Sequence, residues 1–235
     1  MIEQSKSDEE SHNRRLDRQK FYLELTQKEK YDEPFLRRSK SYEFDLAKKC
    51  TVLIVDGDLE NNNSKIHYQK YHHYVEVNER ILFFVTEVKI IDSLLDELKA
   101  DPSITKISVG TRESVAALSL KNAQLALEVG SKIRPLAKLY RYEELRLLIN
   151  ISHPNKEFFG TVVANLDQSG NKLELIQTLQ VYIEENGDSN QIAKRLNIHR
   201  NTLSYRLERI RQLTGRNPKH LLELFELLCG LAWKP

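Results

Sequence analysis

The sequence predicts an α/β domain followed by a smaller all-α domain. Between residues 47 and 150, short β-branched runs alternate with segments whose apolar residues recur at helical spacing. This alternation is typical of an α/β sandwich, in which helices cover an antiparallel sheet. From residue 173 onward, helical patterns follow one another. We therefore divide the chain into a charged, partly helical segment (1–46), the α/β domain (47–150), a linker (151–172) and the all-α domain (173–235).

The composition is that of a globular protein without extreme charge. Of the 235 residues, 40% are hydrophobic and 30% are charged, and the net charge is +2. Any attraction to nucleic acid must therefore come from local clustering of basic residues. No apolar run is long enough to span a membrane, and the N-terminus lacks the apolar core of a signal peptide, so we expect a cytoplasmic protein without a membrane partner. Cys50 and Cys229 lie far apart, beside or within apolar runs, and are expected to be buried free thiols.

The charged first segment contains a helical pattern over residues 14–31, which Pro34 interrupts, and then a second short helical or irregular segment over residues 35–46. The candidate inward residues of the first pattern are Leu16, Phe21, Leu23 and Leu25. We expect this helix to dock on the domain that follows.

The α/β domain is predicted from β-branched runs and helical periodicity. Strands are expected over residues 51–56, 73–77, 80–87, 104–109 and 137–140. Helices are expected over residues 89–100, 112–129 and 142–149, with a loop or weak helix over 57–69. Asn78 and Glu79 separate two adjacent strands and are expected to form a hairpin turn.

The all-α domain begins with a helical pattern over residues 173–186 and ends with an apolar helix over 221–233. The last helix is expected to pack on the first, and the alternative is that part of it forms a dimer contact. Between them, residues 189–196 and 200–214 predict two helices joined by a tight turn. Ser189 is the expected N-cap of the first of these, and Gly215 is the expected C-cap of the second.

The second helix of this pair has an apolar stripe and an opposite polar face. Its inward residues are Leu203, Leu207, Ile210 and Leu213. Between Lys194 and Arg216, seven lysine or arginine residues are opposed by Glu208 alone. A basic face with amide and hydroxyl groups suits phosphates and base edges of DNA. From the pattern alone, an ordinary helical hairpin with a solvated basic face remains an equal alternative.

The segment HRNTLSYRLERIRQLTG, residues 199–215, resembles the C-terminal helix-turn-helix of the PucR/CdaR family of bacterial transcription regulators. That family's signature is HRNTLxYRLxRIxxLTG. The matching positions are His199, Arg200, Asn201, Thr202, Leu203, Tyr205, Arg206, Leu207, Arg209, Ile210, Leu213, Thr214 and Gly215. The resemblance implies a DNA-binding regulator whose second helix enters the major groove. It also implies an N-terminal ligand-sensing domain, in whose place this chain has a highly charged segment of about 45 residues, so we expect a member without its usual sensor.

Residues 107–130 and 136–151 resemble the second half of the degenerate GGDEF-like domain that precedes the helix-turn-helix in this family. An active GGDEF-type cyclase needs glycines in its central hairpin and carboxylates for Mg²⁺, whereas the hairpin here, residues 77–80, contains no glycine. Asp56 and Asp58 are expected to form a turn, and adjacent strand residues such as His72 and His73 point to opposite faces. We therefore expect no enzyme activity, no catalytic residue, no cofactor and no metal site.

These patterns together predict a sequence-specific DNA-binding transcription regulator that binds double-stranded DNA as a homodimer. A small-molecule effector of unknown identity is a further candidate partner. The candidate DNA-binding residues are Gln191, Lys194, His199, Arg200, Asn201, Thr202, Ser204, Tyr205, Arg206 and Arg209. Arg206 is expected to contact phosphate, and His199 is expected either to cap the helix or to contact phosphate. The alternative is a ligand- or protein-interaction module in which the helix-turn-helix serves mainly docking or dimerisation.

Overall fold

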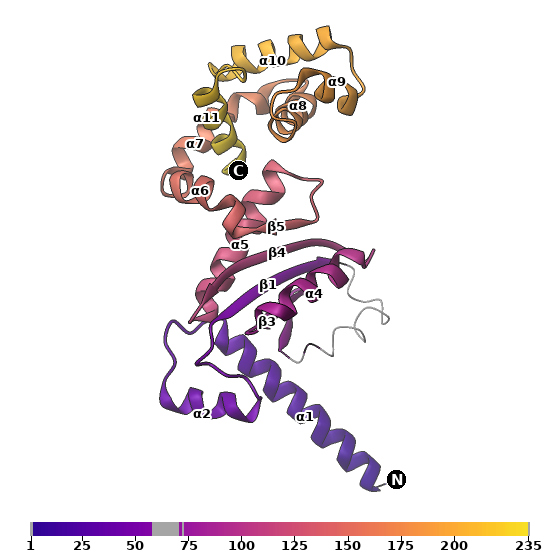
Figure 1. Cartoon of the computed structure of the whole chain (residues 1–235), viewed down its shortest axis with the longest axis vertical. Helices are drawn as coiled ribbons and strands as arrows, with labels where there is room; N and C mark the ends of the chain where they lie inside the picture. The colour runs from indigo at the N-terminus through magenta and orange to yellow at the C-terminus, as the bar shows by residue number, and fades with distance from the viewer. Residues whose placement is uncertain (1, 58–70, 72, 235) are drawn as a thin grey trace. The chain divides into compact units, whose positions relative to one another are not determined.

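The computed structural model describes residues 2–57, 71 and 73–234, with side chains from residue 13 onward (Figure 1). The chain divides into two compact units, which are described one at a time. The first unit contains Met1–Leu127 and Ala137–Glu144, and the second contains Glu128–Leu136 and Leu145–Pro235. Most of the loop or weak helix expected over residues 57–69 lies outside the described residues.

The first unit is built on a five-stranded sheet with the order β2-β3-β1-β4-β5. Its strands are β1 (Cys50–Gly57), β2 (Tyr74–Val77), β3 (Arg80–Val85), β4 (Ile104–Glu113) and β5 (Leu139–Arg141). The sheet is mixed, so the prediction of an antiparallel sheet is wrong at one edge: β5 pairs with β4 in parallel. The helix between β4 and β5 explains this, because a helical crossover returns the chain in the same direction.

The hairpin between β2 and β3 is confirmed. Its two turn residues, Asn78 and Glu79, have φ angles of 47° and 63°, and Val77 pairs with Arg80. Two successive residues with positive φ are the mark of a type I′ turn, whose twist matches that of the strands.

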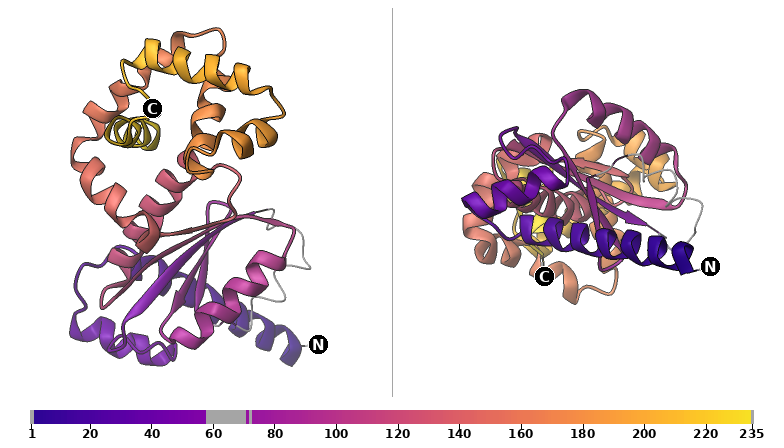
Figure 2. Two further views of the ribbon diagram at one scale, coloured as in Figure 1. Left: turned by 45° about the horizontal axis from the view of Figure 1, so that its top comes forward. Right: turned by 90° about the horizontal axis from the view of Figure 1, so that it is seen from below.

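One face of the sheet is covered by α4 (Val88–Ala100), which lies along it in Figure 2. Leu94, Leu95 and Leu98 of this helix are fully buried against alternate residues of the strands, such as Leu53 and Phe83. The helical spacing of the leucines and the alternation along the strands together account for this core.

The opposite face is covered by α5 (Ala116–Ile133) and by aromatic residues of the N-terminal segment. Tyr22 stacks on Phe84 with ring centroids 5.0 Å apart, and its hydroxyl lies 2.6 Å from Nδ1 of His73. Helix α5 begins later than residue 112, where the sequence predicts its start. Arg112 continues strand β4 instead, since it pairs with Thr51 of β1.

Two helices precede the sheet: α1 (Ile2–Leu25) and α2 (Glu33–Ser41). The predicted docking of the first on the α/β domain is confirmed, because Phe21 and Leu25 are buried. The assignment of Leu16 and Leu23 as inward residues is wrong, since both are exposed. Tyr22 occupies the buried position instead, because an aromatic side chain can reach Phe84 of the sheet.

Ser119 of α5 forms hydrogen bonds at a bulge between β1 and β4. The pairing of β1 with β4 shifts register between Thr51 and Leu53. The Ser119 hydroxyl accepts a hydrogen bond from the amide of Val52 at 2.8 Å and donates to the carbonyl of Thr111 at 2.5 Å. A fully buried side chain therefore satisfies the amide that the bulge leaves without a strand partner.

We expect the Ser119→Ala substitution to lower the free energy of unfolding by about 1–3 kcal/mol, because it leaves the buried Val52 amide unsatisfied. Urea unfolding measures the change. The control is Ser131→Ala on the same helix, whose exposed hydroxyl donates to Glu128, and it should change stability by less than about 0.5 kcal/mol. Equal effects of the two substitutions would contradict the role given to Ser119.

The second unit is helical. Its elements are the end of α6 (Tyr142–Ser152), η1 (His153–Asn155), α7 (Lys156–Val162), η2 (Ala164–Gln168), α8 (Lys172–Glu184), α9 (Ser189–Leu196), α10 (Arg200–Thr214) and α11 (Leu221–Ala232). Residues 151–172, expected as a linker, contain short helical segments, and their buried Val163 and Leu166 belong to the core of this unit. Helix α11 packs mainly on α7, where a Cβ at Gly230 would lie 3.1 Å from the carbonyl oxygen of Phe159. The expectation that the last helix packs on the helix over residues 173–186 is therefore wrong, because α7, which lies in the expected linker, takes that place.

Both cysteines are buried and free, as predicted. Burial raises the pKa of the Cys50 thiol to about 12 and that of the Cys229 thiol to about 11. The thiolate is the reactive form. We therefore expect neither cysteine of the native protein to react with a thiol reagent at pH 8 within minutes, and both to react at once in denaturant. Rapid labelling of either residue in the native protein would contradict this prediction.

Candidate nucleic-acid interface

Helix α9 begins at a side-chain cap and ends in a left-handed turn. The Asp188 carboxylate accepts hydrogen bonds from the amides of Asn190 and Gln191, so the prediction that Ser189 is the N-cap is wrong by one position. Aspartate and serine cap equally well, and the backbone decides between them. At the other end, Asn197 has φ 51°, a left-handed conformation that asparagine tolerates. The amide of Ile198 donates a hydrogen bond to the carbonyl of Ala193.

Helix α10 has caps at both ends and spans the predicted residues 200–214. Nδ1 of His199 accepts a hydrogen bond from the amide of Asn201 at 3.2 Å, which confirms the capping role. Because Nδ1 is the acceptor, the imidazole hydrogen is on Nε2. Gly215 ends the helix with φ 68°, a conformation that favours glycine. Its amide donates a hydrogen bond to the carbonyl of Arg211.

One side of α10 is fixed in the core of the unit. Leu203, Leu207 and Ile210 are buried, while Leu213 is half-buried. Helix α8 packs against both α9 and α10. The buried stripe therefore determines which side chains of α10 point to solvent.

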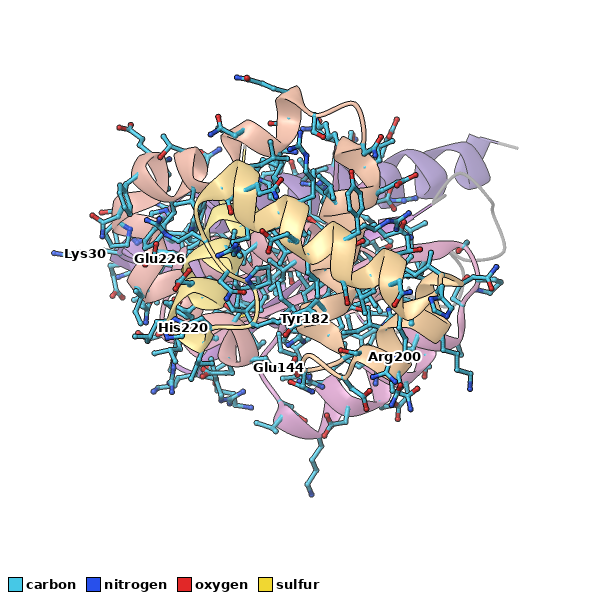
Figure 3. All side chains as sticks on the ribbon, turned by 90° about the horizontal axis from the view of Figure 1, so that it is seen from above. Lys30, Glu144, Tyr182, Arg200, His220 and Glu226 are labelled. Atoms are coloured by element: carbon cyan, nitrogen blue, oxygen red, sulfur yellow. The ribbon has the colours of Figure 1, made fainter. Side chains whose placement is uncertain are left out.

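The opposite side of α10 is open and polar. Figure 3 looks onto this outer side, with Arg200 labelled where the helix begins. Tyr205 is 62% exposed although it is a large aromatic residue. The structure brings all but one of the candidate DNA-binding residues to the exposed surface of α9, the turn and α10. These are Gln191, Lys194, His199, Arg200, Asn201, Thr202, Ser204, Tyr205 and Arg209.

The basic residues of this region fall into two groups. Four arginines each pair with glutamate: Arg195 with Glu184 and Glu185, Arg206 with Glu174, Arg211 with Glu208, and Arg216 with Glu226. Lys194, Arg200 and Arg209 form no ion pair with any described residue. These three cations are therefore free to meet the phosphates of a nucleic acid.

The pairing of Arg211 with Glu208 lowers the pKa of the glutamate. Two hydrogen bonds of 2.8 and 2.9 Å join the guanidinium to the carboxylate. They hold the pKa of the Glu208 carboxyl below its usual range. Glu208 thus stays ionised and offsets the charge of Arg211.

Arg206 differs from the other candidates. Its side chain is only 14% exposed and lies against α8, where it meets Glu174 at 2.8 Å and Thr178 at 3.4 Å. Sequence reasoning named Arg206 but missed Glu174, because no spacing rule connects residues on different helices.

The first unit offers a groove of about 410 Å³ between the hairpin, the end of β1 and α5. Asp56 and Arg80 line it, and the Asp56 carboxylate lies 2.9 Å from Nε of Arg80. The guanidinium thus occupies the place where a cation would neutralise this carboxylate. Asp58, His67 and His72 lie outside the described residues. Among the residues that are described, no group of three or more His, Cys, Asp or Glu could hold a metal ion.

The described helices include none with both the length and the apolar character needed to cross a membrane.

Comparison with known proteins bears on the second unit. Residues 175–233 match the family described as the PucR C-terminal helix-turn-helix domain. The chain is 26% identical to an uncharacterized protein of Haemophilus influenzae over 91% of its own length and 63% of that protein's. It is 32% identical to the purine catabolism regulatory protein of Bacillus subtilis, over 40% of this chain and 19% of the relative.

A third relative is the DNA-binding transcriptional activator AdeR of Bacillus subtilis, 30% identical over 52% of this chain and 29% of the relative. The matches thus span less than two thirds of the length of each of these relatives. The family match covers α9, α10, α11 and nearly all of α8, the elements that form the exposed basic face and its support. Residues 175–233 are therefore similar to the PucR C-terminal helix-turn-helix domain over the elements that carry the candidate DNA-binding residues.

Proposed function

We propose that this chain is a sequence-specific DNA-binding transcription regulator, with α10 as its recognition helix. The observation that carries the proposal is the outer face of α10, where Arg200, Asn201 and Arg209 stand exposed beside a buried apolar stripe. Arginine and asparagine are the side chains that read guanine and adenine in the major groove. The names of two relatives, a regulatory protein and a DNA-binding transcriptional activator, support the same function.

Within this proposal, the exposed residues of α10 contact bases, and Lys194 and Gln191 of α9 lie near the phosphate backbone. The residues of α10 are Arg200, Asn201, Thr202, Ser204, Tyr205 and Arg209. His199 caps the helix and presents its Nε2 hydrogen to solvent, so it can also donate to a phosphate. A single helix-turn-helix covers one half-site, and we therefore propose that two copies bind half-sites one helical turn apart, about 34–36 Å.

For the α/β domain, we propose a GGDEF-like fold that has lost catalysis. The hairpin turn contains no glycine to admit a phosphate, and both of its residues are exposed. Asp56 is neutralised by Arg80 rather than left free to bind a metal ion. A nucleotide turnover assay with the purified chain tests this point, and measurable turnover would contradict it.

A second candidate function is a ligand-binding module in which the helix-turn-helix serves docking or dimerisation. The groove lined by Asp56, Arg80 and Gln124 is the observation in its favour. A flat salt dependence of nucleic-acid binding would support this alternative over a regulator.

The deciding experiment is the selection of random duplex DNA by the purified chain at two salt concentrations. We expect the bound pool to converge on one motif, an inverted repeat with half-sites about one helical turn apart. Salt-sensitive binding without a motif would indicate a nonspecific DNA-binding protein. No retention of DNA at low salt would refute the proposal.

A further inference from the structure

Arg206 is the one candidate DNA-binding residue that the structure turns inward. It lies in the middle of α10, yet its guanidinium reaches two residues of α8 that are one helical turn apart. Nη2 donates to Glu174 at 2.8 Å, and Nη1 lies 3.4 Å from the hydroxyl of the fully buried Thr178. The Thr178 hydroxyl in turn donates to the Glu174 carbonyl at 2.7 Å. A guanidinium held by two partners cannot turn outward to DNA without giving up a charge-assisted hydrogen bond.

This contact joins the middle of α10 to α8 and therefore bears on the rotation of α10 about its own axis. Successive residues of a helix are about 100° apart, so a small rotation moves every exposed side chain relative to a base pair. Apolar contacts along the stripe tolerate such a rotation better than a planar guanidinium bound to a carboxylate does. A second Arg–Glu contact, from Arg195 to Glu184 and Glu185, ties α9 to the end of α8 in the same way.

We propose that Arg206 is a positioning residue, which through Glu174 sets the rotation of α10 and thereby the sequence preference of the domain. This inference rests on the proposed function, and it replaces the expectation that Arg206 contacts phosphate. The two roles differ in what they predict for Glu174. If Arg206 met phosphate, Glu174 would compete with DNA, and its removal would strengthen binding.

The test compares Arg206→Ala, Glu174→Gln and the exchanged pair Arg206→Glu with Glu174→Arg. The matched control is Glu208→Gln, which makes the same charge change at a glutamate that pairs on the exposed side of α10. The readouts are affinity for the selected motif, affinity for unrelated DNA, and the slope of log K against log salt. Urea unfolding of the same four variants and of the Arg206→Ala/Glu174→Gln double variant is measured without DNA.

We expect Arg206→Ala and Glu174→Gln each to lower the ratio of specific to nonspecific affinity about tenfold, with the salt slope unchanged. Glu208→Gln should leave that ratio unchanged, and the exchanged pair should recover most of the loss. In urea, the effects of the two single substitutions should be non-additive, as expected for residues in contact.

Three results would overturn the inference. One is a lower salt slope for Arg206→Ala together with equal losses on specific and nonspecific DNA, which is the behaviour of a phosphate contact. Another is a Glu174→Gln variant that matches Glu208→Gln in every readout. The side chain of Glu174 is 55% exposed, so Glu174→Gln should fold and can test the inference even if Arg206→Ala does not fold. The third is additivity of the two single substitutions in their effects on the free energy of unfolding, a measurement that needs no DNA. A wild-type chain that selects no motif would instead refute the proposed function.

Discussion

Replacement of Arg209 by alanine should weaken binding to the selected DNA by about tenfold to a hundredfold, which corresponds to roughly 1–3 kcal/mol. Arg209 lies on the exposed face of α10 and forms no ion pair with a described residue; its guanidinium only approaches Gln212, at 3.3 Å. The full charge of its side chain is therefore available to a base edge or a phosphate. We expect Asn201→Ala to cost a similar factor and to relax the preference at one base pair.

The matched control for Arg209 is Arg211, which has the same residue type on the same helix and is also exposed. Arg211 is already engaged by Glu208 through two hydrogen bonds. Arg211→Ala should therefore change affinity by less than about threefold and leave the salt slope unchanged. Titrations of each variant at several salt concentrations give both quantities. If Arg209→Ala and Asn201→Ala kept full affinity and sequence preference, the outer face of α10 would not be the reading face.

The ion pairs of Arg211 and Arg206 differ in whether the sequence can predict them. The apolar stripe and the motif fix the ends of α10 and its exposed face, and the structure has both as predicted. The pairing of Arg211 is within reach of a spacing rule, because Glu208 precedes it by one helical turn. The pairing of Arg206 with Glu174 is not, since it depends on how α8 and α10 pack together.

The sequence predicts those parts of the fold that depend on local patterns and mispredicts those that depend on residues distant in sequence. Runs of β-branched and apolar residues correctly identify β1 and β3, and leucine spacing correctly identifies α4, because both patterns are local in the sequence. The sequence predicts the edge strand β5, but the antiparallel direction that it predicts is wrong, because the direction depends on the crossover through α5. In α1, the helical period alone suggested Leu16 and Leu23, whereas the burial of Tyr22 depends on aromatic partners distant in sequence.

Substitution of Gly110 by alanine should destabilise the α/β unit by more than about 3 kcal/mol. Gly110 lies in β4, where the strand passes directly beneath α5. A Cβ atom there would lie 2.7 Å from the hydroxyl oxygen and 2.8 Å from the carbonyl carbon of Ser119, and closer still to its carbonyl oxygen. Backbone atoms cannot move aside as a flexible side chain can, so strand and helix would have to separate. That separation would also strain the hydrogen bond from Val52 to Ser119.

The chain offers a control for this substitution in Gly170, where an added Cβ would have no neighbour within 4 Å. Gly170→Ala should leave stability unchanged or raise it by less than about 1 kcal/mol, since alanine reduces the entropy of the unfolded chain. Urea unfolding followed by circular dichroism compares the two variants with the wild type. A stable Gly110→Ala variant would mean that α5 can shift on the sheet. In that case Ser119 would not be the fixed partner of Val52, and Ser119→Ala should then be nearly neutral.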